Sequence, residues 1–384
     1  MISIRRSGAM AAIVTVFITG TAGLLAGSGI WATAASADTT FLGGLTQNNP
    51  VASTVPTSNG DINPYGVAVV PRSTGDLVQG DVLVSNFNNS ANQQGTGTTI
   101  MQVSPAGTAT QFAGIDRHLA GCPGGVGLTT ALVVLRSGWV IVGSLPTTDG
   151  HPDGLSGPGC LIVLDSQGNV RETFRGGGIN GPWVMTALDL GGITELFVTN
   201  VLNGIVPPPV GSTTNSTANE GTVLRILISS TPFALPHRLL TTQIGSGFAE
   251  TTDPNALIIG PTGVGLGRNG TLYVADTVNS RIAAIPNAVL RVKDDGTGQT
   301  VSEGNHLNGE LGLAIAPNGD ILTVNGGDPN IVETTPSGNQ VTVENIDLST
   351  PGGAGGDLFG LAVSLDGKAV YYVNDGNNML YSLS

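Results

Sequence analysis

One pattern recurs six times between Tyr65 and Leu383, and it limits this chain to few architectures. A copy opens with small and apolar residues, often after a glycine, passes through a tight turn and ends in a β-branched or aromatic run followed by Asn, Asp or Ser. The clearest copy, residues 312–325, reads GLAIAPNGDILTVN. Two strands joined by a turn explain it, because Gly supplies positive φ and Pro presets the first corner.

The copies start at residues 66, 131, 185, 263, 312 and 360. Each is followed by a second pair of short strands, so each predicts a four-stranded antiparallel blade. Short strands with Gly/Pro turns at such a period are typical of a β-propeller. We therefore expect an all-β, six-bladed β-propeller. The widest step holds only one additional strand pair, residues 223–228 and 238–244, and adds no seventh blade.

The last copy stops after its third strand, Met379–Leu383. Its fourth strand must come from the N-terminal end, within residues 41–55, which closes the ring and removes exposed sheet edges. Residues 205–220 and 246–255 are interpreted as insertions within a blade.

Composition agrees with one β-domain over residues 38–384. Gly contributes 58 of 384 residues and charged residues only 11%, against about a quarter charged in ordinary domains. No stretch after the N-terminus shows sustained helical periodicity.

The N-terminus reads as an export signal over residues 1–37. Arg5 and Arg6 precede a weakly apolar stretch, and Ala35-Ser36-Ala37 forms a small-residue cleavage site. We expect a secreted or periplasmic protein. An uncleaved membrane anchor stays open as an alternative, because the apolar stretch is long enough to span a bilayer.

Net charge excludes one class of partner. The whole chain carries −13, and such acidity repels phosphate backbones, so we expect no nucleic-acid binding. We expect no membrane contact apart from the signal segment, and a monomer.

The two cysteines, Cys122 and Cys160, are expected to form a disulfide. Antiparallel blades place the loops after their second and fourth strands on one face, which we call the top face; the turns after the first and third strands form the turn face. Both cysteines fall in top-face loops, and exported proteins favour disulfides.

The repeats resemble NHL repeats and the wider six-bladed TolB-like propellers, which include gluconolactonase-like and strictosidine-synthase-like proteins. Residues 271–282, TLYVADTVNSRI, are close to the NHL consensus, and residues 364–378 resemble blades of the gluconolactonase-like members. This resemblance implies the fold. It covers lactonases, lyases, synthases and binding scaffolds, so it implies no single activity.

The lactonase-like members hold a divalent metal at the top centre with a Glu, an Asn and an Asp. Asp375 matches their Asp, and Asp276 occupies the same place two blades earlier. Where their Asn precedes the blade-opening Gly, this chain has Phe359 and Thr262. Their Glu-Gly-Pro motif is absent, and Asn63-Pro64-Tyr65-Gly66 stands instead. The resemblance therefore lacks two of three ligands.

Other relatives, the amidating lyases, hold zinc with histidines from several blades. His118, His151 and His306 fall on the expected top face, whereas His237 falls on the other side. Loop histidines are more often solvated than metal-bound, and the sequence identifies no cofactor; a divalent cation belongs to the enzyme hypothesis.

The strand-end residues form a repeating set: Asn86, Ser144, Asn200, Asp276, Asn325 and Asp375. They could line the top opening, but short polar side chains at strand ends usually accept backbone N–H bonds, which we favour here. Glu310 differs, because it stands where sister blades carry Pro64 and Pro261. We expect its carboxylate to be solvated.

The sequence favours a scaffold that binds a small molecule or a protein partner at the top face. The alternative is a metal-dependent hydrolase, lactonase or lyase with its site at the top centre. Its candidate ligands are Glu310, His306, Asp276, Asp375 and His118.

Overall fold

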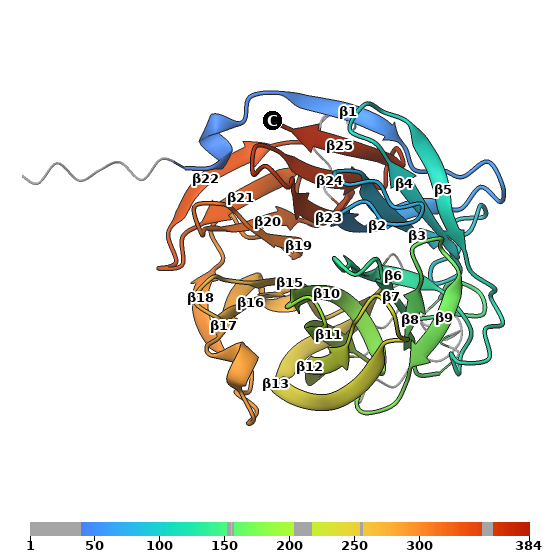
Figure 1. Ribbon diagram of the computed structural model, residues 1–384. Coiled ribbons are helices and arrows are strands. Elements are labelled where there is room, and N and C mark those ends of the chain that lie inside the picture. The colour runs from blue at the N-terminus through green and yellow to red at the C-terminus, as the bar shows by residue number, and fades with distance from the viewer. Residues whose placement is uncertain (1–39, 152–154, 156, 203–216, 254–255, 348–355) are drawn as a thin grey trace, which may run out of the picture. The chain divides into compact units, whose positions relative to one another are not determined.

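Short strands and tight turns make up almost all of the chain that the structure describes. The computed structural model describes residues 40–151, 155, 157–202, 217–253, 256–347 and 356–384. Within them helix is limited to the 3-10 segments η1 (Leu42–Gly44), η3 (Thr277–Asn279) and η4 (Ala288–Leu290). The all-β prediction is confirmed, and the strands take a β-propeller arrangement (Figure 1).

Four sheets have four strands each. They comprise β2 (Ile62–Val69), β3 (Val82–Asn88), β4 (Thr99–Val103) and β5 (Ala109–Gly114); β15 (Pro261–Leu266), β16 (Leu272–Asp276), β17 (Arg281–Ile285) and β18 (Gln299–Glu303); β19 (Glu310–Ile315), β20 (Ile321–Asn325), β21 (Asn330–Thr334) and β22 (Gln340–Asn345); and β23 (Leu358–Val363), β24 (Val370–Asn374) and β25 (Met379–Leu383) with β1 (Asn48–Ser53). In each, sequence neighbours pair antiparallel, as the turns between them require.

The second and third repeats share a nine-stranded sheet, which corrects the expectation of six separate four-stranded sheets. It comprises β6 (Leu128–Val134), β7 (Val140–Ser144), β8 (Cys160–Leu164), β9 (Val170–Phe174), β10 (Gly181–Asp189), β11 (Ile193–Val201), β12 (Thr217–Ser229), β13 (His237–Asp253) and β14 (Leu257–Ile259). The physical reason is one parallel bridge between Val184 and Thr130, which joins β10 to β6.

The N-terminal strand pairs with the C-terminal one. β1 lies antiparallel to β25, with Asn48 opposite Leu383 and Ser53 opposite Met379. Beside it, the backbone N–H groups of Phe41 and Leu42 donate to the carboxylate of Glu333 at 2.7 and 2.8 Å. The predicted location of this strand, within residues 41–55, is therefore correct.

Six innermost strands, β2, β6, β10, β15, β19 and β23, face a common centre (Figure 1). β2 contacts β6 and β23, β10 contacts β6 and β15, and β19 contacts β15 and β23. The repeated glycine explains how they approach so closely. A Cβ on Gly312 would stand 2.1 Å from the carbonyl oxygen of Phe359, and one on Gly360 would stand 2.2 Å from that of Tyr65.

The third repeat departs from the predicted lengths. β12 and β13 pair along most of their 13 and 17 residues, and β13 continues to Asp253. Residues 246–253 are therefore strand and not the expected insertion. Most of the other expected insertion, residues 205–220, lies outside the described residues.

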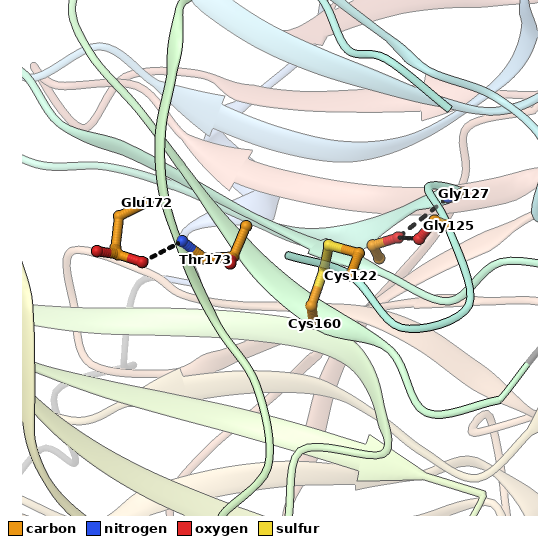
Figure 2. The surroundings of a disulfide bond; sticks show 7 residues. Cys122, Gly125, Gly127, Cys160, Glu172 and Thr173 are labelled. Atoms are coloured by element: carbon orange, nitrogen blue, oxygen red, sulfur yellow. Dashed lines mark hydrogen bonds between the residues drawn. A yellow bond between two sulfur atoms is a disulfide. The ribbon is translucent and has the colours of Figure 1, made fainter. Parts of the chain in front are cut away.

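The predicted disulfide is present (Figure 2). It links Cys122, in the loop before β6, to Cys160, the first residue of β8, with their Cα atoms 5.4 Å apart, a normal separation for such a bridge. Both side chains are buried in the cluster between the first two repeats, with Phe112, Ile115 and Leu128. The bridge therefore fastens a top-face loop to the core.

The expected export signal, its cleavage site and the anchor alternative all lie outside the described residues. Among the described residues, no helix is long and apolar enough to cross a bilayer.

Candidate functional site

Aromatic side chains fill the centre of the molecule near the top face. Tyr65 stacks on Phe359 at 4.1 Å and on Phe87 at 4.8 Å between ring centroids, and Trp183 meets Tyr65 edge-on at 6.1 Å. Leu257 and Ile258 of β14 join this cluster. All of these side chains are buried, so aromatic rings and not an open pocket occupy this part of the centre.

A cavity of about 550 Å³ lies below this aromatic cluster. Its wall comes from the six innermost strands and runs from Trp183 and Phe359 to Pro71, Arg136 and Asp189 at the turns. Trp183 is buried, the last residues of the innermost strands are partly exposed, and Arg136 is exposed. The cavity therefore opens on the turn face, whereas the sequence placed the site on the top face. Bulky rings fill the top end, and smaller aliphatic side chains leave space at the other.

The strand-end polar residues Asn200, Asn325 and Asp276 bond to neighbouring groups of the chain, and Asn200 accepts backbone N–H bonds as the turn interpretation predicts. Asn200 Oδ1 accepts hydrogen bonds from the N–H groups of Asn180 and Gly181. Asn325 Nδ2 donates to the carbonyl of His306 at 2.7 Å. The buried Asp276 forms an ion pair with Arg281 at 2.7 Å. The side chains of Asn200, Asn325 and Asp276 are therefore held by these partners within the protein.

The register corrects one member of this set. Pro64 pairs with Asn86, Pro261 with Asp276 and Glu310 with Asn325, and the matching pair in the last blade is Leu358 with Asn374. Asn374, not Asp375, is therefore the equivalent of Asp276. Asn374 ends β24 and Asp375 directly follows it, so only the strand pairing distinguishes these two polar residues.

Glu310 is fully buried, which contradicts the expectation of a solvated side chain. It begins β19, and Leu311, the next residue, lines the cavity, while Glu310 itself does not. Neither carboxylate oxygen has a hydrogen-bond partner among the described residues. Burial, with a smaller contribution from Asp276, raises the pKa of Glu310 to about 8, although nearby N–H dipoles and Arg281 oppose the shift. Glu310 is therefore protonated at neutral pH.

Asp375 is only partly buried, in the turn between β24 and β25. Its Oδ1 atom has no hydrogen-bond partner among the described residues, while its N–H donates to the carbonyl of Asp357 at 2.9 Å. Burial first, then the charge of Asp357, raises the pKa of Asp375 to about 7. Burial first, then the charges of Asp375 and Asp253, raises the pKa of the Tyr65 hydroxyl.

The candidate metal ligands do not converge. His118 and His306 are exposed in different loops, and Asp276 is held by Arg281 and Asn279. Within the described ranges, no three His, Cys, Asp or Glu side chains are placed to hold a metal ion. The residues therefore do not fit the three-ligand site that the resemblance implies.

Sequence reasoning missed the aromatic cluster and the cavity beneath it. The available signal was a large side chain directly before the repeated glycine, as at Tyr65 and Phe359. That position faces the centre, so a bulky residue there closes it.

Searches against protein-family models and against curated protein sequences find no match. Solved structures do match over most of this chain. A luciferin-regenerating enzyme has a TM-score of 0.53 and 10% identity, covering 87% of this chain and 95% of its own. A gluconolactonase from Xanthomonas campestris has a TM-score of 0.50 and 11% identity, covering 88% and 95%.

An aldose sugar dehydrogenase from Streptomyces coelicolor, solved with bound PQQ, has a TM-score of 0.50 and 13% identity, covering 88% of this chain and 97% of its own. At such low identity these matches establish the fold and not the activity. They agree with the resemblance drawn from the repeats: the chain has the fold of the gluconolactonase-like β-propellers.

Proposed function

We propose that the protein is a hydrolase of small lactones or esters, with Asp375 as its acid–base group on the top face. The observation that carries this proposal is Asp375, whose buried Oδ1 atom has no hydrogen-bond partner among the described residues, together with its pKa of about 7. A general base works best when its pKa lies near the working pH. Two structures of the same fold are named as a gluconolactonase and a luciferin-regenerating enzyme, which favours an enzyme over a binding scaffold.

The chemistry follows from the protonation states. Above pH 7 the Asp375 carboxylate accepts a proton from water as the water oxygen attacks the carbonyl carbon. The resulting carboxylic acid then returns that proton to the leaving alkoxide as the ester bond breaks. Tyr65 keeps its hydroxyl proton, because burial raises its pKa well above the ordinary value. No step is assigned to a metal, since the donor set does not fit one.

The test is a screen of γ- and δ-lactones and p-nitrophenyl esters with the full chain and with Asp375→Asn. We expect loss of 10²-fold or more in kcat/KM, in the range of about 10²–10⁴ for a general base. The wild-type rate should rise with pH through about 7, and EDTA should leave it unchanged.

Asp366→Asn is the matched control. Asp366 lies in a turn of the same sheet, is exposed, and has a lowered pKa because Ser364 and Lys368 donate to it. This variant should retain wild-type kcat/KM. Equal rates for wild type and Asp375→Asn on every hydrolysed substrate would refute the assignment.

We infer further that the six repeats act as six blades and that β1 closes their ring. The contacts between innermost strands and the pairing of β1 with β25 support this. Export through residues 1–37 is part of the same proposal, and the disulfide is compatible with it.

A further inference from the structure

The cavity on the turn face has no role in the ester hydrolysis proposed above. Each innermost strand contributes to its wall: Val69, Val134, Ala187, Leu266, Ile315 and Val363 are examples. Its volume of about 550 Å³ lies within the usual range for small-molecule sites.

The inner end of this cavity offers little to a polar group. The Thr130 hydroxyl donates to the carbonyl of Trp183, and the Thr262 hydroxyl is shared with Thr277 and the carbonyl of Glu310. Trp183 and Phe359 complete this end. Whatever enters must be apolar at its tip, because burying an unpaired polar group there is costly.

Two charged side chains, Arg136 and Asp189, line the cavity, and both lie at its rim. Arg136 lines the opening, and no ion-pair partner of its guanidinium is found in the described part of the chain. The carboxylate of Asp189 accepts hydrogen bonds from the N–H groups of Arg136 and Gly191 and from the Thr194 hydroxyl.

We propose that this cavity binds an aliphatic carboxylate of the fatty-acid type. The hydrocarbon chain lies between the innermost strands with its end near Trp183 and Phe359, and the carboxylate stays at the rim beside Arg136. Arginine suits this role because its guanidinium remains charged and can donate two parallel hydrogen bonds to a carboxylate. The cavity opens on the turn face and Asp375 lies on the top face. Fatty-acid binding can therefore be tested independently of the proposed hydrolase activity.

Isothermal titration calorimetry with decanoate below its micelle concentration tests this inference on the full disulfide-bonded chain. We expect saturable one-to-one binding, which Arg136→Gln weakens about tenfold, a typical loss for one charged hydrogen bond. Arg72→Gln is the matched control, since Arg72 lies on the same face but does not line the cavity; it should bind as wild type does.

Ala362→Phe should abolish binding, because Ala362 lines the wall and the ring would fill the space. Thermal unfolding shows whether this variant is folded, and Ala362→Leu replaces it if it is not. Absence of saturable binding, or affinity unchanged by the filling variant, overturns the site. Equal affinity for decyltrimethylammonium, or no loss with Arg136→Gln, overturns the anionic head group.

Discussion

At the scale of single residues, two buried carboxyl groups at neighbouring strand ends have opposite surroundings. Asp276 accepts hydrogen bonds from Arg281 and Asn279, so its buried charge is compensated. Glu310 has no such donor among the described residues. An uncompensated buried charge is unfavourable, so this side chain takes up a proton instead.

The first prediction concerns Glu310→Gln. The pKa of Glu310 rises from 4.5 to about 8 on folding, so between these values the folded chain holds a proton that the unfolded chain has lost. Stability is therefore highest below pH 4.5 with respect to this group, falls as the pH rises, and levels off above about 8. The full loss would approach about 5 kcal/mol from the pKa difference.

Urea unfolding at several pH values between 5 and 9 measures this effect. Glu310→Gln should be more stable than wild type at pH 9 and lack the downward slope. Exposed Glu303 in the preceding sheet supplies the control, and Glu303→Gln should keep the wild-type slope. Parallel curves for Glu310→Gln and wild type would contradict the buried, proton-binding carboxyl.

The residue scale is also where the sequence was least reliable. It could single out Glu310 as an exception among prolines, and the register confirms its place opposite Asn325. It could not show that this side chain is buried, because burial depends on the adjacent sheet. The sequence also could not show which residue, Asn374 or Asp375, is equivalent to Asp276. The pairing of Asn374 with Leu358 answers this.

At the scale of elements, prediction succeeded wherever a strand and its turn are encoded locally. The strands around Gly319 are encoded in this way. The pairing of β1 with β25 is not local, and it was predictable because the last repeat lacks a fourth strand of its own. Prediction failed for β13, whose length depends on pairing with β12. The bridge of β10 to β6 likewise arises between repeats and leaves no local signal.

The second prediction removes the N-terminal strand. Deleting residues 40–56 removes β1, so the backbone groups of β25 that pair with it become an open edge. The deletion also removes Asn48, whose Oδ1 accepts a bond from Tyr372. Open edges promote aggregation, so we expect loss of the monomer peak in size-exclusion chromatography. A monomeric deletion variant that melts like the parent would argue against closure by β1.

The third prediction concerns the disulfide. Its cysteines are 38 residues apart, and a loop of that length gives about 4 kcal/mol in the chain-entropy treatment. The variant with Ala at both Cys122 and Cys160 should lose stability of this order in urea unfolding. Reductant should lower the stability of the wild type toward the variant and leave the variant unchanged; an equal response of both proteins would show that the bridge is not responsible.

At the scale of the whole molecule, the repeats determine how closely neighbouring sheets pack around the centre, but they do not determine which ligand or substrate the protein binds. The repeated glycine lets neighbouring innermost strands approach, while the residue before it determines whether the centre is open or filled. Tyr65 and Phe359 fill the top end, so a fold whose sequence pointed to a top-face pocket has its cavity at the other end. The fold was therefore predictable from the pattern, whereas the cavity required the side-chain packing.

The fourth prediction tests this assembly through Gly312→Ala. The added Cβ would stand 2.1 Å from the carbonyl oxygen of Phe359 and 3.1 Å from the Leu361 side chain in the next sheet. A backbone carbonyl cannot rotate away as a side chain can, so the two sheets must separate, and we expect a loss of about 3 kcal/mol or more, as for other overpacked sites. Gly192→Ala is the control, since its added Cβ would come no closer than 3.7 Å to the Thr231 side chain. Thermal and urea unfolding of both variants measure the difference. If Gly312→Ala unfolds together with the control, close approach of the innermost strands is not what the repeated glycine provides.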